Sequence, residues 1–270
     1  MRKSSNNPTL DSELFSVKIK IAKANSVKHP FLSTKHFLSL AVSDDPKKDP
    51  ILKQVIPSES ERIYNRKFVE DPLNEKQFSP LPKLIHRYKD RALILCTNKC
   101  FIHCRFCFRK RIWKNNCPTW KISETEFEKI EKYVSNDIRI RELILSGGDP
   151  LTMPDEKIFR MLSKIDRIPH VNVIRIATRA LSAEPSRVNA RFVRALKHSS
   201  KKIWFMSHFN HPAELSKATK EAIRGLSDSG IPVLNQTVLL KGINDNPEIL
   251  SELFRNLVSL KAIPHYLFHV

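Results

Sequence analysis

The sequence is poor in glycine, cysteine and acidic residues. Its 270 residues include 5 glycines and 5 cysteines, and 47 lysines and arginines outnumber 28 aspartates and glutamates. Five cysteines, three of them clustered, do not fit the disulfide framework of a small secreted protein. No apolar run approaches the roughly 20 residues that cross a bilayer, which excludes a helical membrane span. The charged N-terminus is not followed by an apolar segment, so we expect no signal peptide, no membrane partner and a cytoplasmic protein.

The shortage of acidic residues leaves a formal net charge of +19, which can attract nucleic acid or an acidic protein. The lysines are spread along the chain, as they are on solvated helix faces, and no basic patch interleaved with aromatic residues lies near the cysteines. A basic metal-binding module that contacts RNA or an acidic protein is therefore one alternative. The sequence itself argues against nucleic acid as a partner.

What the sequence does contain is a cluster of three cysteines. Cys104 lies four positions after Cys100, and Cys107 lies three positions after Cys104. Iron–sulfur clusters and structural zinc ions usually have four protein ligands. Three thiolates on a cluster therefore leave one iron open to a ligand that is not protein, and these three residues are our candidate metal ligands.

A zinc site is the competing interpretation of the same cysteines. It would take its fourth ligand from His103, Cys96 or Cys117. Zinc ribbons usually have a second Cys or His pair after a spacer, and no such pair exists here. The spacing therefore favours an iron–sulfur cluster.

From residue 92 onward, short apolar runs alternate with amphipathic helices. The last four of these expected strands start about 30 residues apart, the length of one βα unit. Such alternation indicates an α/β fold with a parallel sheet, here a partial (β/α)6 barrel at residues 81–270 that follows a mostly helical N-terminal extension at residues 1–80. The expected strands are 92–96, 143–145, 171–176, 203–206, 233–239 and 263–268.

Reacting groups in such barrels lie at the C-terminal ends of the strands. The cysteine cluster begins just after the first expected strand, and Gly147 and Gly148 follow the second. Glycine lets a backbone approach a ligand closely. Taken alone, the segment Ser146–Pro150 fits a tight turn between strand and helix equally well.

Together, the cysteines and the glycine segment resemble the radical S-adenosylmethionine (SAM) enzymes. In that superfamily the open iron binds the amino and carboxylate groups of SAM, and one electron from the cluster yields a 5′-deoxyadenosyl radical that abstracts a hydrogen atom. The resemblance implies a [4Fe–4S] cluster, SAM, and an electron donor such as flavodoxin or ferredoxin. It places Gly147, Gly148 and Asp149 beside the SAM methionine.

Five further segments resemble the lysine 2,3-aminomutase family, which includes the enzyme that β-lysylates elongation factor P. They are 86–91, 107–111, 175–179, 207–212 and 235–245, and the resemblance covers roughly residues 45–270. It implies that pyridoxal phosphate lies against Arg87, Tyr88 and Arg91 and that Arg109 holds the substrate carboxylate. The remaining residues implied to line the SAM and pyridoxal cavity are Thr178, Arg179, His208, Asn210, Asn235 and Gln236. Taken singly, each is also explained as a satisfied polar residue at a strand end.

The family pattern continues beyond Val270 with a glycine-rich loop whose lysine anchors pyridoxal phosphate. Gly242 is the last glycine here, and no lysine has that context. The sequence therefore predicts a C-terminally truncated isomerase of the lysine 2,3-aminomutase type, acting on a small amino acid or on a lysine of elongation factor P, and possible as a homo-oligomer. The alternative is a truncated or repurposed protein that binds the cluster and SAM without aminomutase activity.

Overall fold

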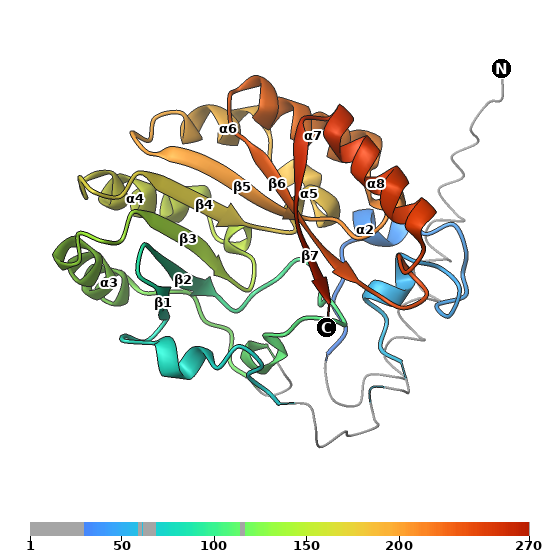
Figure 1. Ribbon diagram of the computed structural model, residues 1–270, viewed down its shortest axis with the longest axis horizontal. Helices are drawn as coiled ribbons and strands as arrows, with labels where there is room; N and C mark the ends of the chain where they lie inside the picture. The colour runs from blue at the N-terminus through green and yellow to red at the C-terminus, as the bar shows by residue number, and fades with distance from the viewer. Residues whose placement is uncertain (1–29, 59–60, 62–68, 114–116, 270) are drawn as a thin grey trace.

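A computed structural model describes residues 30–58, 61, 69–113 and 117–269. Its centre is a sheet of seven strands that lie side by side in chain order (Figure 1). β1 pairs antiparallel with β2, and the other five pairings are parallel. The strands are β1 (Leu84–Tyr88), β2 (Arg91–Thr97), β3 (Glu142–Gly147), β4 (Val173–Ala177), β5 (Lys202–His208), β6 (Val233–Leu239) and β7 (Ala262–His269). The six parallel strands confirm the predicted α/β fold, and β1 is an addition to it.

Helices connect the parallel strands and follow the outer side of the curved sheet in Figure 1. The longer ones are α3 (Glu124–Asn136), α4 (Asp155–Asp166), α6 (Ala190–Leu196), α7 (Lys217–Asp228) and α8 (Pro247–Ser259). Short turns of helix at the strand ends are α5 (Ala180–Ala183), η4 (Lys110–Ile112), η5 (Pro150–Thr152), η6 (Pro185–Arg187) and η7 (Pro212–Glu214). Among the described helices, none has the length and apolar character needed to span a membrane.

The beginning of α3 shows how local sequence sets these helices. The Ser123 side chain accepts a hydrogen bond from the Glu126 backbone, and the Glu126 carboxylate accepts one from the Ser123 backbone. This reciprocal pair is a capping box, which satisfies amide groups that have no partner within the helix. Phe127, Ile130 and Val134 then recur on the buried face. These residues bind α3 to the sheet through apolar packing.

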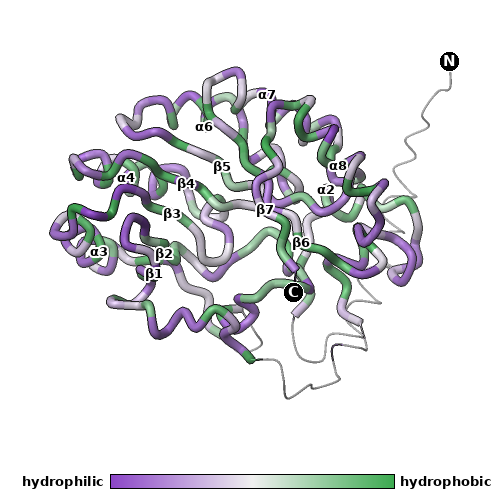
Figure 2. Tube along the Cα trace, in the orientation of Figure 1, coloured by the Kyte–Doolittle hydropathy of each residue, from purple (hydrophilic) through white to green (hydrophobic). Residues whose placement is uncertain are grey.

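The sheet is buried on one face and half-exposed on the other. In β4, Ile174 and Ile176 are fully buried, whereas Arg175 between them is not. Successive strand residues point to opposite faces, so the helices cover the face that carries Ile174 and Ile176. Figure 2 shows hydrophobic stretches along the strands and an alternation of hydrophobic and hydrophilic residues along the outer helices. The opposite face of the sheet is therefore free to present polar side chains.

The described part of the N-terminal extension contains only short helical segments instead of a mostly helical unit. They are α2 (Lys35–Ser39), η1 (Leu52–Gln54) and η3 (Glu75–Phe78). Prolines at positions 46, 50, 57, 72 and 80 interrupt longer helices. Phe37, Ile51 and Leu52 are fully buried in a second apolar cluster that includes Ile102 of the cysteine loop. The extension thus packs directly against the candidate metal ligands.

Candidate metal centre at the strand ends

The cysteine loop begins where β2 ends and is joined there to the end of β3. The Gly148 amide donates to the Thr97 carbonyl at 2.6 Å, and the Asp149 amide donates to the Lys99 carbonyl at 2.6 Å. These bonds hold residues 97–99 in place just before Cys100. The two features singled out in the sequence, the cysteines and the glycines, are therefore neighbours in space.

Gly147 and Gly148 are required by this close approach of two backbone segments. Gly147 has φ +117°, a conformation that side chains disfavour. A Cβ on Gly148 would overlap the Lys99 carbonyl oxygen and lie 2.8 Å from the Lys99 carbonyl carbon. Their predicted contact with the SAM methionine stays a prediction, but the packing against the cysteine loop already explains both glycines.

The three candidate ligands form a set of neighbouring, half-buried thiols. Burial raises the pKa of Cys100 well above its ordinary value, and the charges of Asp149, Cys107 and Cys104 raise it further. Burial also raises the pKa of Cys107, and Cys104 adds to that effect. Negative charge on Cys100 and Cys107 is therefore disfavoured in the absence of a cation, and bound iron would compensate it. This donor set fits an iron–sulfur cluster.

A site for a single metal ion is not formed by the described residues. Within that part of the chain, no three His, Cys, Asp or Glu side chains converge as ligands of one ion. A cluster is bound through separate thiolates on separate irons, so it does not require convergence on one point. The His103 ring stacks on Trp113 at 4.0 Å, and its Nδ1 hydrogen-bonds the Pro30 carbonyl at 2.8 Å. These contacts give His103 a structural role.

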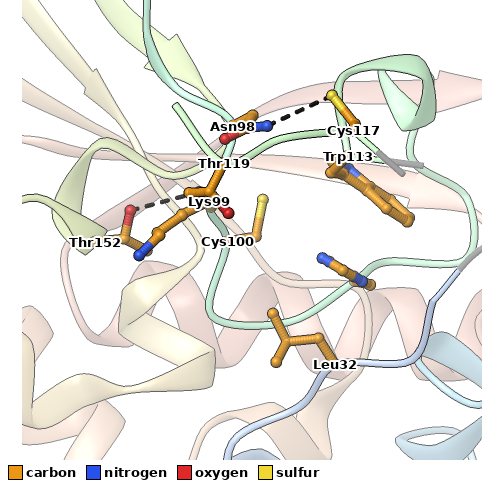
Figure 3. A pocket seen from close by; sticks show the side chains of 9 residues that line it. Leu32, Asn98, Lys99, Cys100, Trp113, Cys117, Thr119 and Thr152 are labelled. Carbon is orange, nitrogen blue, oxygen red and sulfur yellow. Dashed lines mark hydrogen bonds between the residues drawn. The ribbon is translucent and has the colours of Figure 1, made fainter. Parts of the chain in front are cut away.

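The two other cysteines, Cys96 and Cys117, lie in different surroundings from each other. Cys96 is fully buried within β2, and burial raises its pKa to about 12. The Cys117 thiol lies 3.2 Å from the Ile112 carbonyl oxygen. Cys117 and Cys100 line the same cavity of about 400 Å³, together with Lys99 and Thr152 (Figure 3).

Asp149 ties the end of β3 to the end of β4. Its buried carboxylate accepts hydrogen bonds from the Leu151 amide at 3.0 Å, the Arg179 amide at 2.8 Å and the Thr178 hydroxyl at 2.8 Å. Burial raises the pKa of Asp149 to about 6 against the opposing effect of these bonds. Asp149 and Thr178 are thus fixed to each other beside the glycine segment.

Arg179 reaches from the end of β4 to the cysteine loop. Its Nη1 lies 3.0 Å from the Cys104 sulfur, while Nη2 lies 2.5 Å from Gln54 Oε1 and 3.1 Å from Glu214 Oε2. Burial alone lowers the pKa of Arg179, but Cys104 and Glu214 outweigh burial and raise it. Gln54 and Glu214 could not be identified from sequence motifs, because they lie 125 and 35 residues from Arg179.

His208 and Asn210 extend the same group from the end of β5. Asn210 is fully buried and donates to Gln54 Oε1 at 2.9 Å. Its Oδ1 lies 3.1 Å from His208 Nε2, which assigns the imidazole proton to that nitrogen. The His208 ring also stacks on Phe106 of the cysteine loop at 5.3 Å. Two of the predicted cavity residues are therefore next to the candidate ligands.

Neutral His208 makes stability depend on pH. Burial, followed by the charge of Arg179, lowers the pKa of His208 from 6.5 to about 3. The unfolded chain binds this proton below pH 6.5 and the folded chain does not, so stability falls as pH drops from 6.5 toward 3. Because of His208, the free energy of unfolding of the wild-type protein should be about 2 kcal/mol lower at pH 5 than at pH 7. His208→Gln should remove this difference. Urea unfolding of both cluster-free proteins at the two pH values measures this, and equal losses would refute it.

Asn235 and Gln236 on β6 have different positions. Asn235 is fully buried, and its amide group bonds the Phe209 backbone nitrogen at 2.8 Å and oxygen at 3.1 Å. It holds the end of β5 to β6. Gln236 is half-exposed and pairs in register with His208. Of the two, Gln236 is the one that a ligand can reach.

Arg109 is engaged by the chain's own carboxylate. Its Nε and Nη2 donate to Glu75 Oε1 at 2.9 and 2.7 Å, and its Nη1 lies 3.3 Å from the Ser146 hydroxyl. Arg111 binds the other oxygen of Glu75. The side chains of Arg109 and Glu75 are 10% and 6% exposed. The predicted role of Arg109 toward a substrate carboxylate stays a prediction, and Glu75 is a partner that the sequence did not reveal.

Arg87, Tyr88 and Arg91 lie at the opposite end of the sheet from the cysteine loop. Tyr88 pairs with Arg91 where β1 turns into β2, and Arg91 pairs with Glu142 at the start of β3. The length of β2 separates them from the cysteines, about 20 Å at 3.3 Å per residue. Arg91 binds Asp90 at 3.0 Å, and Arg87 binds the Leu73 carbonyl at 3.1 Å. The structure therefore does not bring this predicted group together with the others.

Comparison with known proteins gives one family model and several relatives. The model of the radical SAM superfamily matches residues 94–253. An L-lysine 2,3-aminomutase of Methanococcus maripaludis is 41% identical over 93% of this chain and 57% of its own length. A putative L-lysine 2,3-aminomutase of Aquifex aeolicus is 40% identical over 89% and 64%, respectively. An L-lysine 2,3-aminomutase of Buchnera aphidicola is 36% identical over 92% and 71%. The chain thus spans 57 to 64% of the first two relatives.

Proposed function

Because the chain belongs to the radical SAM superfamily, and within it to the lysine 2,3-aminomutase family, we propose that it cleaves S-adenosylmethionine at a [4Fe–4S] cluster to start a 1,2-amino migration on lysine or a lysine-like substrate. One observation carries the proposal. Cys100, Cys104 and Cys107 occupy a single loop after β2, and backbone hydrogen bonds join the start of that loop to Gly148 and Asp149. The identity of the substrate, lysine or a lysine-like amino acid that is either free or part of a protein, belongs to the proposal.

The chain's own residues have defined parts in this function. Each of the three thiolates would bind one iron, and a cluster with bound SAM supplies the electron and the hydrogen-abstracting group. The ring of Phe106, within the loop, stacks on His208 at 5.3 Å and so holds the loop against the end of β5. Arg179 donates to Cys104 and compensates its negative charge. Asp149 and Thr178 fix the neighbouring strand end.

Pyridoxal phosphate fits the described residues less well. The arginines assigned to its phosphate are already bound elsewhere, Arg91 to Asp90 and Arg87 to the Leu73 carbonyl. They also lie at the far end of β2 from the cysteines. These positions favour a second candidate function for this chain by itself: cleavage of SAM without amino migration.

Measuring two products in one reaction separates the two candidates. The anaerobically reconstituted chain would be supplied with dithionite, SAM, lysine and pyridoxal phosphate, and 5′-deoxyadenosine and β-lysine would be quantified together. Both products support the aminomutase, and 5′-deoxyadenosine alone supports the second candidate. A protein that holds the cluster and forms neither product contradicts both. The Cys104→Ala variant is the control for uncatalysed cleavage.

A further inference from the structure

We propose that Gln54 and Glu214 are positioning residues that hold Arg179 as a hydrogen-bond donor to Cys104, and that this arrangement sets the reduction potential of the cluster. The inference rests on the proposed cluster and goes beyond it. It assigns a redox role to two residues outside the cysteine loop. One of them, Gln54, comes from the N-terminal extension.

Arg179 is fixed on every side of its guanidinium. Nη1 lies 3.0 Å from the Cys104 sulfur, and Nη2 lies 2.5 Å from Gln54 Oε1 and 3.1 Å from Glu214 Oε2. The guanidinium also lies 5.3 Å from the ring of Phe37 and 5.3 Å from the ring of Phe106. Its side chain is 8% exposed. A guanidinium held in this way has one orientation available, and that orientation presents Nη1 to the sulfur.

Gln54 connects the extension to three parts of the centre. Its backbone carbonyl accepts a hydrogen bond from the Arg105 amide, inside the cysteine loop, at 2.8 Å. Its side-chain oxygen accepts from Arg179 and from Asn210 Nδ2, and its Nε2 donates to Glu214 Oε1 at 3.2 Å. Gln54 is fully buried. A shift of Gln54 would therefore move the loop and the guanidinium together.

Glu214 supplies the negative charge that Arg179 faces. Its carboxylate is fully buried and also accepts from the Asn210 and His211 amides at 2.8 and 3.1 Å. A buried carboxylate without a cation is costly, so Arg179 and Glu214 stabilise each other. The pair is close to neutral overall. Glu214 thus limits how much of the Arg179 charge acts on Cys104.

These contacts bear on redox chemistry because the reduced cluster carries one more negative charge than the oxidised cluster. A hydrogen bond or a positive charge at a ligand sulfur stabilises the reduced form and raises the potential. Arg179 provides both at Cys104. Loss of the donor should lower the potential, whereas loss of the Glu214 charge should raise it. A purely structural role predicts no such opposite signs.

EPR-monitored redox titration of the anaerobically reconstituted chain without SAM tests this inference. Relative to wild type, we expect a lower midpoint potential for Arg179→Gln and a smaller decrease for Gln54→Met, which removes the Oε1 acceptor that helps to orient Arg179. We expect a higher midpoint potential for Glu214→Gln. The control Glu221→Gln makes the same change of charge at an exposed site on α7 and should leave the potential unchanged.

Opposite shifts for Arg179→Gln and Glu214→Gln support the proposal. Shifts of the same sign, or no shift at normal cluster content, overturn it. If Glu214→Gln fails to assemble a cluster, Gln54→Met decides, because it removes no charge; an unchanged potential in that variant overturns the proposal. A wild-type chain that assembles no cluster would instead refute the proposed function.

Discussion

Replacing Cys100, Cys104 or Cys107 singly by alanine is expected to abolish cluster binding. Each thiolate would hold a separate iron, so the remaining two cannot retain the cluster against loss or exchange. Removing a ligand should cost more than the roughly 10- to 100-fold that is typical of outer-shell substitutions. Iron and acid-labile sulfide contents after anaerobic reconstitution, together with the visible absorption of the cluster, measure the loss.

Cys117→Ala is the matched control for these variants. Cys117 lines the same cavity as Cys100 but hydrogen-bonds the Ile112 carbonyl and lies outside the cysteine loop (Figure 3). Its removal should leave iron and sulfide at wild-type levels. An equal loss of cluster in Cys117→Ala, with retention in Cys107→Ala, would mean that the ligand set is assigned incorrectly.

Gly148→Ala is expected to have the second largest effect. The new methyl group would overlap the backbone of Lys99 and Asn98, which are fixed by their own hydrogen bonds and cannot yield as a flexible side chain would. We expect a decrease in the free energy of unfolding of about 1–3 kcal/mol, the typical range of substitutions that overpack a core. The cysteine loop begins at the displaced segment, so cluster content should fall as well. Urea unfolding and iron analysis measure the two effects.

Gly225→Ala makes the same chemical change and is expected to have the opposite effect on the free energy of unfolding. Gly225 lies within α7, and a Cβ there meets no atom within 4 Å. Alanine in a helix interior is favoured over glycine by roughly 0.5–1 kcal/mol, so this variant should be more stable than wild type. If Gly148→Ala were as stable as Gly225→Ala, the close approach of the two backbone segments could not be the reason for the glycine.

The parallel strands and their helices were predictable because their signals are local. The expected strand at 233–239 coincides with β6, and α3 begins at a capping box formed by residues only three positions apart, Ser123 and Glu126. β1 was not predicted, since its five residues include the polar His86 and Arg87 and its stability comes from pairing with β2. The periodicity of apolar residues indicates which face of a single helix or strand is buried, but it gives no information about which strands pair.

Only those parts of the candidate site that form contiguous sequence motifs could be predicted. The cysteines and glycines are contiguous motifs, and the structure places them together. Glu75 reaches Arg109 across 34 residues, and Gln54 reaches Arg179 across 125. Tertiary packing brings these partners together, and no local pattern in the sequence distinguishes the glutamine and the glutamate that make these contacts. The sequence therefore indicated the candidate ligands but not the residues that contact them from distant parts of the chain.

The EPR spectrum of the anaerobically reconstituted, reduced chain, with and without SAM, tests the central claim most directly. If Cys100, Cys104 and Cys107 hold a [4Fe–4S] cluster with one open iron, the reduced protein should give a cluster signal that changes on addition of SAM. Cys104→Ala should give no such signal. A wild-type protein that retains zinc, or whose cluster signal is unaffected by SAM, would contradict the account.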